Sequence, residues 1–203
     1  MVKEGIYYEN RNGRKKVGVE ILATPWAYCS NEELFRVINE DIDFKVFLHH
    51  LQHTEEGMVN FINIKPPTLI KFRDEIVILM EQNKNVVLEL SEDFIGNAEL
   101  NMLAKLKENH RLKISLDDFG KSSSNIDRVV ALLPEFVKLD IRMFPSEKSL
   151  STLVETITRI SPHTRVIAEG VESPHDLLFL RRLKITLWQG FLEKSLNGLR
   201  ICL

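Results

Sequence analysis

The chain has 203 residues, of which 44% are hydrophobic and 28% are charged, and its formal net charge at pH 7 is -2. These values fit a single globular domain over residues 1–203 with a sizeable core. The near-neutral charge argues against general binding to nucleic acid or to a membrane surface, because both require a basic footprint.

The two cysteines, Cys29 and Cys202, are too few for a disulfide framework, so we expect a reducing compartment. The N-terminal segment MVKEGIYYEN contains no apolar run typical of a signal peptide. No stretch approaches the ~20 apolar residues that are needed to cross a bilayer. These features together predict a cytoplasmic protein.

The N-terminal region predicts two strands and then a helix. The segment from Ile6 to Leu22 reads as two strands joined at Asn12-Gly13, a dipeptide suited to turns with positive φ. From Asn31 to about His53 the spacing of apolar residues predicts an amphipathic helix. The apolar residues that carry this prediction are Leu34, Val37, Ile38 and Ile42.

Beyond this helix, short apolar runs alternate with helix-like segments. Such alternation predicts a parallel sheet covered by helices, either closed as a barrel or doubly wound. The predicted strands are Met58–Ile64, Val86–Leu90, Leu112–Leu116, Phe136–Leu139, Arg165–Ala168 and Ile185–Trp188. The helical segments include Glu99–Asn109, Leu150–Ile160 and Pro174–Leu183, the last preceded by Ser173 as an N-cap.

Polar residues gather within or just after the C-terminal half of most of these strands. A TIM-like barrel builds its site from such positions on several strands, whereas a doubly wound sheet uses one switch point. We therefore predict an α/β fold of the TIM-like (β/α)8 type, trimmed relative to the ~250 residues that are typical. The polar residues are Glu89 and Glu92, Asp117 and Asp118, Lys138 and Asp140, Glu169 and Glu172, and Gln189.

Several carboxylates at one barrel mouth would repel each other unless a cation lay among them. Oxygen ligands without cysteine or paired histidine favour a hard cation, Mg²⁺ or Mn²⁺. Two such ions roughly 3.5–4 Å apart would suit hydrolysis of a phosphodiester by water. Taken singly, however, an acidic residue after a strand is more often the N-cap of the next helix.

The ordered segments VGVEIL, FINIKP, LELSE, SLDDFG, VKLD, AEGVE and WQGF resemble the motifs of EAL-domain phosphodiesterases, from about Val17 to Ser195. Enzymes of that family cut the second messenger cyclic di-GMP to linear pGpG. The resemblance implies a barrel of the EAL type, for which we expect an irregular antiparallel first strand. It also implies cyclic di-GMP as the ligand and a divalent metal cofactor.

The resemblance further implies a role for individual residues. Lys138 would contact the hydrolytic water or the phosphate, and Gln189 would support the water network. Glu169 would be a metal ligand or the general base, and Glu92 would brace the loop after Asp118. The other implied metal ligands are Glu20, Asn63, Glu89, Asp117 and Asp118.

The chain also departs from the family pattern. Thr24 stands where relatives have an arginine that contacts the ligand, and weaker nucleotide binding is the expected result. The segment Lys121–Asn125 lacks the glycine and the aromatic residue of the usual loop, so that loop is expected to have another shape. Glu20 and Asn63 are 43 residues apart (63 − 20), closer than in most members of the family, so we expect a reduced helix near the barrel mouth. A reduced helix there predicts a more open nucleotide pocket.

Two functions follow from these observations. The first is metal-dependent hydrolysis of cyclic di-GMP, with reduced activity. The second is a non-catalytic EAL-like module that binds cyclic di-GMP weakly or regulates a partner protein. A homodimer is expected from the resemblance. His49 and His53 would share one helix face and suggest a zinc site, but without the glutamate of an HExxH motif we predict a solvated or interface face.

Overall fold

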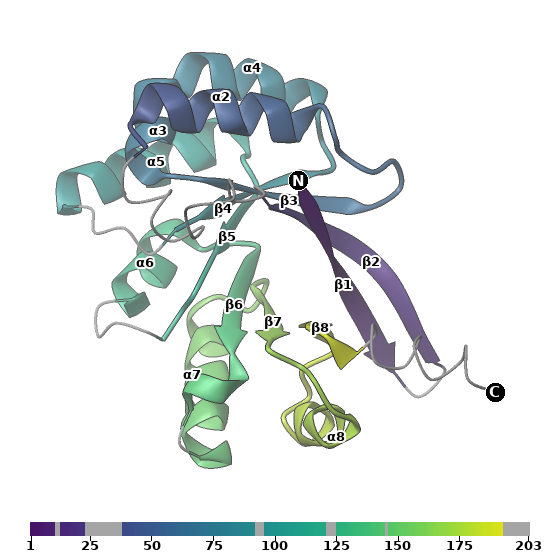
Figure 1. Cartoon of the computed structure of the whole chain (residues 1–203). Coiled ribbons are helices and arrows are strands. Elements are labelled where there is room, and N and C mark those ends of the chain that lie inside the picture. The colour runs from purple at the N-terminus through teal and green to yellow at the C-terminus, as the bar shows by residue number, and fades with distance from the viewer. Residues whose placement is uncertain (11–12, 23–37, 92–95, 121–124, 145, 193–203) are drawn as a thin grey trace. The chain divides into compact units, whose positions relative to one another are not determined.

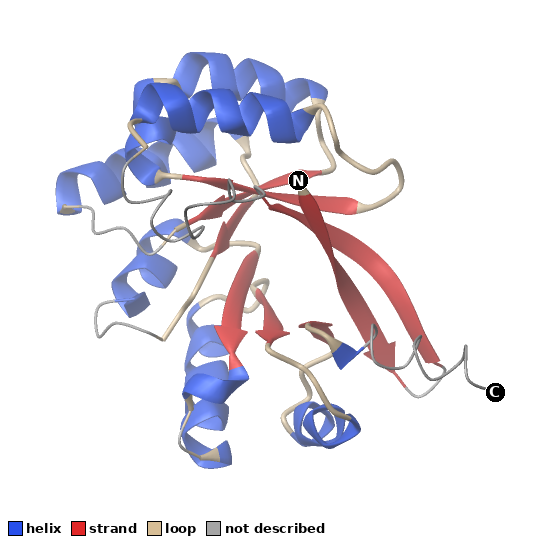
Figure 2. Ribbon diagram, in the orientation of Figure 1, coloured by secondary structure: helices blue, strands red, loops and turns tan. Residues whose placement is uncertain are grey.

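The computed structural model describes residues 1–10, 13–22, 38–91, 96–120, 125–144 and 146–192. Its strands follow one another as hydrogen-bonded neighbours from β1 to β8 and close into a barrel, and helices alternate with them from β3 onward (Figures 1 and 2). The predicted TIM-like (β/α)8 fold is therefore confirmed. The chain divides into two compact halves, Met1–Glu4 with Gly18–Asp117 and Gly5–Val17 with Asp118–Leu203.

Each predicted strand has a counterpart close to its predicted limits. The strands are β1 (Val2–Asn10), β2 (Gly13–Leu22), β3 (Val59–Ile64), β4 (Val86–Leu90), β5 (Ile114–Leu116), β6 (Phe136–Asp140), β7 (Arg165–Glu169) and β8 (Leu187–Gln189). The helices are α2 (Glu40–Leu51), α3 (Pro66–Lys71), α4 (Arg73–Gln82), α5 (Asn97–His110), α6 (Asn125–Leu132), α7 (Glu147–Ile160) and α8 (Pro174–Arg182), with a short 3-10 helix, η1, at Ile141–Met143. Among the described residues, no helix combines the length and the apolar character that crossing a bilayer would require.

In the first half, the register of the parallel strands β2 to β5 brings polar residues onto one face. Glu20 is the Cα partner of Phe61, and Asn63 is the partner of Glu89, which in turn pairs with Ser115. Side chains two residues apart on a strand point to the same side of the sheet. Glu20, Asn63 and Glu89 therefore share one face of this sheet.

Helix α2 packs against β3 and α3 in this half. It begins after Asn39, whose side-chain oxygen accepts a hydrogen bond from the backbone N–H of Ile42 at 3.0 Å. Its buried residues are Asp43, Phe47 and His50, whereas Ile42 is 45% exposed. The prediction that Ile42 lies on the buried face of this helix was wrong. The helix instead turns Asp43 inward, where its carboxylate accepts a hydrogen bond from the Lys65 N–H at 3.0 Å.

In the second half, β6, β7 and β8 are parallel, and β1 joins β8 in the antiparallel sense. The predicted antiparallel first strand is thus confirmed. Tyr7 lies opposite Trp188 and stacks on it with ring centroids 4.8 Å apart, and the guanidinium of Arg14 lies 4.9 Å from the Trp188 ring. Such cross-strand aromatic pairs stabilise antiparallel strands.

Helices α7 and α8 both begin with a serine N-cap, Ser146 and Ser173, and Pro174 occupies the first turn of α8 as predicted. The buried residues of α8 are Leu177 and Leu180, whereas Leu178 is 52% exposed. The helix therefore buries a narrower apolar stripe than its leucine content suggests.

The end of β8 depends on a glycine. Val171 donates a backbone hydrogen bond to the Gln189 oxygen at 3.2 Å, and Leu192 donates one to the Val171 oxygen at 3.1 Å. A Cβ atom on Gly190, which lies between these bonds, would be 2.2 Å from the Val171 oxygen. The backbones can approach this closely only because residue 190 has no side chain.

We therefore predict that Gly190→Ala lowers the free energy of unfolding by about 1–3 kcal/mol, because the new methyl group forces two backbones apart. Chemical denaturation measures this effect. Gly96→Ala is the comparison, because its nearest atom would lie at 3.6 Å, and a smaller loss of about 0.5–1 kcal/mol is expected because alanine is a poorer N-cap than glycine. Equal losses in the two variants would contradict the prediction.

Candidate functional site

The first half contributes three of the predicted ligands, and they lie together on the sheet face. The amide of Asn63 donates a hydrogen bond to Glu20 Oε1 at 3.1 Å, and Glu89 is the register partner of Asn63. Glu20 is 4% exposed and Glu89 is completely buried. Burying carboxylates is unfavourable unless hydrogen-bond donors or cations compensate them. This face therefore suits a cation.

The same face continues to Ser115 and then to Asp117, just after β5. The Ser115 hydroxyl is buried and has no hydrogen-bond partner among the described residues. The Asp117 N–H donates to the Leu90 oxygen at 3.1 Å, which fixes the backbone where the strand ends. An unsatisfied buried hydroxyl next to buried carboxylates is typical of a polar site rather than a packed apolar core.

The next residue, Asp118, belongs to the second half and has a φ of 49°, in the left-handed region that aspartate tolerates better than most residues. Carboxylate oxygens of Asp118 and Glu169 lie within 4.8 Å of each other, and an oxygen of Asp117, which is bonded to Asp118 through the peptide link, belongs to the same group. All three side chains are partly exposed. Negative groups this close repel each other unless a cation is present.

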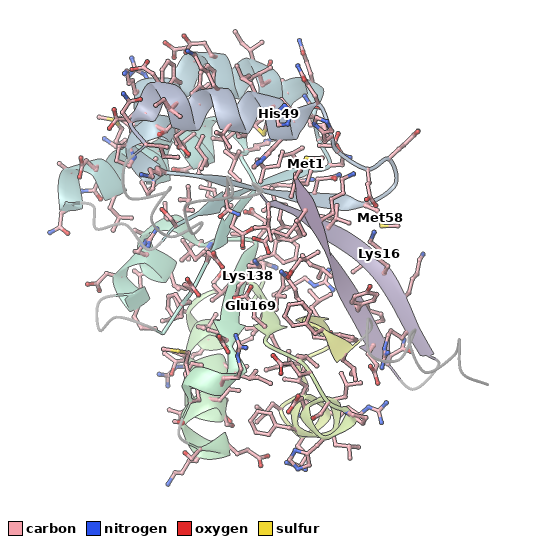
Figure 3. All side chains as sticks on the ribbon, viewed as in Figure 1. Met1, Lys16, His49, Met58, Lys138 and Glu169 are labelled. Atoms are coloured by element: carbon pink, nitrogen blue, oxygen red, sulfur yellow. The ribbon has the colours of Figure 1, made fainter. Side chains whose placement is uncertain are left out.

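Lys138 is the buried cation beside this group. Its ammonium nitrogen lies 3.0 Å from Glu169 Oε1, and its side chain is almost fully buried (Figure 3). Lys138 lies in the middle of β6, whereas Glu169 is the last residue of β7. Gln189, at the end of β8, is 4% exposed and pairs in register with Ile6. The neighbouring strands β6, β7 and β8 thus contribute a lysine, a carboxylate and an amide.

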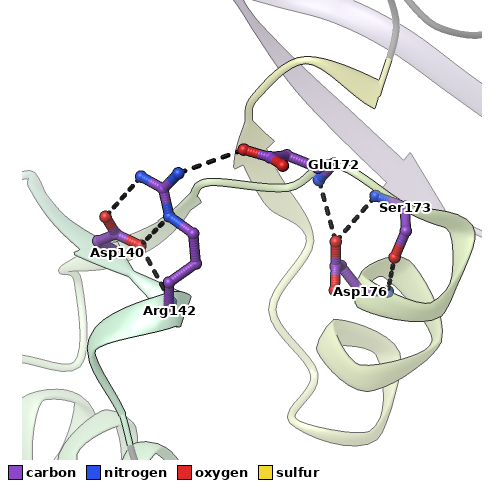
Figure 4. A network of polar contacts seen from close by, with 5 residues as sticks. All are labelled: Asp140, Arg142, Glu172, Ser173 and Asp176. Atoms are coloured by element: carbon purple, nitrogen blue, oxygen red, sulfur yellow. Dashed lines mark hydrogen bonds and ion pairs between the residues drawn. The ribbon is translucent and has the colours of Figure 1, made fainter.

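A second polar network follows the ends of β6 and β7 (Figure 4). The guanidinium of Arg142 donates to both oxygens of Asp140, at 2.9 and 2.8 Å, and to Glu172 at 3.2 Å. Hydrogen bonding to Asp140 raises the pKa of Arg142 above its ordinary value, so this side chain is a permanent cation. Sequence reasoning did not single out Arg142. Its only signal was an arginine placed two residues after a strand-terminal aspartate.

The predicted site residues fall into two described groups. The first half brings together Glu20, Asn63 and Glu89, and the residues from Asp117 onward bring together Asp117, Asp118, Glu169 and Lys138. Glu92, Thr24 and residues 121–124 lie outside the described residues. The roles assigned to all of these residues remain predictions.

The available ligands fit a hard divalent cation. Among the described residues, the group of three or more candidate ligands close enough to share an ion consists of Asp117, Asp118 and Glu169, and all of them offer carboxylate oxygens. Mg²⁺ and Mn²⁺ prefer such ligands. The predicted solvated or interface face of His49 and His53 is exposed at His49 and partly buried at His53, whereas the neighbouring His50 is only 2% exposed.

The EAL-domain family model matches residues 23–193. The chain belongs to the EAL family. Glu20 lies just ahead of the matched residues, so its assignment as a ligand still rests on the resemblance of VGVEIL to the first motif. Many members of this family are cyclic di-GMP phosphodiesterases, and the relatives below include two of them.

The chain is 31% identical over 113 residues to the cyclic di-GMP phosphodiesterase NbdA of Pseudomonas aeruginosa, covering 52% of this chain and 14% of NbdA. It is 25% identical over 218 residues to the cyclic di-GMP phosphodiesterase PdeA of Borreliella burgdorferi, covering 92% of this chain and 32% of PdeA. The chain therefore spans under a third of the length of both relatives.

A solved structure supports the fold. The Bacillus subtilis YkuI protein, crystallised with cyclic di-GMP and calcium, superposes with a TM-score of 0.74 over 93% of this chain and 53% of the YkuI chain. The sequence identity is 23%, so this likeness shows the fold. It agrees with the closed strand order found here.

The buried histidine of α2 generates a prediction. Burial, together with the smaller effects of the positive charges of His49, the chain N-terminus and His53, lowers the pKa of His50 from 6.5 to about 4. The unfolded chain takes up this proton near pH 6.5, whereas the folded chain does not until about pH 4. Stability from a neutral His50 is therefore complete above pH 6.5 and is lost as the pH falls toward 4.

We predict that His50→Leu removes up to about 3 kcal/mol of the pH dependence of unfolding between pH 6.5 and 4. Denaturant titrations at a series of pH values measure it. His110→Gln, at an exposed position at the end of α5, is the control and should leave the pH dependence unchanged. A His50 variant with the same pH dependence as the parent chain would contradict this account.

Proposed function

We propose that this domain hydrolyses cyclic di-GMP to linear pGpG in a reaction that requires Mg²⁺ or Mn²⁺. The observation that carries the proposal is the ion pair between the buried Lys138 and the partly exposed Glu169, next to the carboxylates of Asp117 and Asp118. In this proposal Glu169 is the base, Lys138 is the cation beside it, and Asp117 and Asp118 are metal ligands. Membership of the EAL family supports cyclic di-GMP as the substrate.

Asp117, Asp118 and Glu169 would hold divalent metal. Glu20, Asn63 and Glu89 of the first half would also act as metal ligands, as the resemblance to the family motifs implies. When bound, such ions supply charge neutralisation for a phosphodiester and make a coordinated water more acidic. The protein's own contribution is to hold these oxygens on or just after strands that are hydrogen-bonded to their neighbours in the barrel. The hydrogen bond between Asn63 and Glu20 already orients both side chains before any ion arrives.

In the proposed reaction, Glu169 accepts a proton from the attacking water. The ammonium of Lys138, 3.0 Å away, holds that carboxylate in place. The water oxygen forms a bond to phosphorus as the bond from phosphorus to the ribose 3′ oxygen breaks. The leaving oxygen takes up a proton, and the product is a linear dinucleotide with a 5′ phosphate. Gln189 would orient the water through its amide.

We predict that the purified protein forms pGpG from cyclic di-GMP with Mn²⁺ or Mg²⁺, and that a chelator stops the reaction. Glu169→Gln should lower the rate by roughly 10²–10⁴-fold, because the amide cannot accept the proton. Chromatography of the nucleotides measures both effects.

Glu155→Gln is the matched control, because Glu155 is an exposed acid of α7 in the same half, bonded to Ser151. It should react at the parent rate. If the parent protein gives no pGpG with either metal, the non-catalytic module replaces this proposal. If Glu169→Gln reacts as fast as the parent, Glu169 is not the base.

A further inference from the structure

A pocket of about 540 Å³ opens in the second half of the chain, within the 300–1,000 Å³ that small-molecule sites usually occupy. Residues that follow β6 and β7 line it, together with the first turns of α7 and α8. Its apolar walls include Phe144 and Phe179, and its charged residues include Arg142 and Glu172. Aromatic walls with a few fixed polar groups are typical of sites for planar ring systems.

Arg142 is held in place before any ligand binds. Asp140 accepts two of its hydrogen bonds, at 2.9 and 2.8 Å, and Glu172 accepts a third at 3.2 Å. The guanidinium lies against Gly170, where a Cβ atom would be 2.6 Å from Arg142 Nε. The backbone N–H groups of Glu172 and Ser173 donate in turn to Asp176, at 3.0 and 2.8 Å, which fixes the loop that carries Glu172.

This arrangement leaves part of the guanidinium available. An arginine side chain has five N–H donors, and described residues accept hydrogen bonds from three of its atoms, Nε, Nη1 and Nη2. One N–H on each Nη atom therefore remains, and the Arg142 side chain is 60% exposed. The remaining N–H groups on Nη1 and Nη2 lie in one plane that Asp140 and Glu172 hold, and they can donate to a ligand whose acceptors lie in that plane.

Guanine offers such a pair in its O6 and N7 atoms, and bidentate donation from arginine is the commonest specific contact to this base. Adenine presents N7 beside an amino group, which is a donor and would face the second N–H of Arg142. The chemistry of the held guanidinium therefore favours guanine over adenine.

We propose that Arg142 recognises the O6 and N7 edge of one guanine base of the substrate, with the base in the pocket beside Phe144 and Phe179. This inference rests on the proposed function, because it assigns a base-specificity residue to the same ligand. It also assigns a ligand-binding cation to a chain in which residue 24 is threonine rather than arginine. Asp140, Gly170 and Glu172 act by positioning Arg142.

The test measures equilibrium binding of cyclic di-GMP, its 7-deaza analogue and cyclic di-AMP by titration calorimetry, with Ca²⁺ as in the YkuI complex. The parent protein should bind cyclic di-GMP most tightly, and the 7-deaza analogue, which lacks the N7 acceptor, about 3- to 10-fold more weakly. Arg142→Ala should weaken cyclic di-GMP binding about 5- to 100-fold and abolish the difference between cyclic di-GMP and the 7-deaza analogue.

Arg142→Lys should restore little, because an ammonium cannot donate to both acceptors from one plane. Arg159→Ala, at an exposed position of α7, is the matched control and should bind like the parent. If Arg142→Ala binds all three ligands as the parent does, or keeps the 7-deaza penalty, the inference fails while the proposed function stands. If the parent binds none of the three, both fail.

Discussion

Repulsion between carboxylates is the constraint on which this structure depends. Acidic side chains occupy the ends of neighbouring strands, and oxygens of Asp117, Asp118 and Glu169 lie within 4.8 Å of one another. Such a group is unfavourable in an isolated protein unless positive charge balances it. The buried ammonium of Lys138 supplies one such charge, and a divalent ion would supply the rest. This balance of charge supports the proposal that the domain captures divalent ions, on which the proposed chemistry depends.

The regular register of a parallel sheet explains how distant residues meet. Asn63 and Glu89 are neighbours because β3 and β4 pair residue by residue, and Asp140 and Glu169 are neighbours for the same reason on β6 and β7. Alternation of side chains then decides which residues share a face. A shift by one residue in any strand would turn its ligand to the other side of the sheet. Ile64 and Leu90 follow Asn63 and Glu89 in the sequence and are buried on the opposite face of the sheet. Their packing therefore fixes the register that keeps Asn63 and Glu89 on one face.

The sequence predicted the strands and their polar ends well, because buried parallel strands are short apolar runs and the polar residues that follow them stand out. It did not predict which side chains are buried where this depends on the residue at which a helix begins. It also did not predict contacts between residues far apart in the sequence. Ile42 was expected on an apolar face, but α2 begins at Glu40 and buries Asp43 and His50 instead. Arg142 was missed because Glu172, which accepts one of its hydrogen bonds, lies 30 residues further along the chain. No local pattern reveals such a network.

The most direct test of ion capture is a crystal of the protein grown with Mn²⁺ and measured at a wavelength where manganese scatters anomalously. The account predicts an anomalous peak bonded to oxygens of Asp117, Asp118 and Glu169 at about 2.0–2.2 Å, the range for hard divalent ions of this size. A map without a peak at these carboxylates, in crystals that hold manganese elsewhere or not at all, would contradict it.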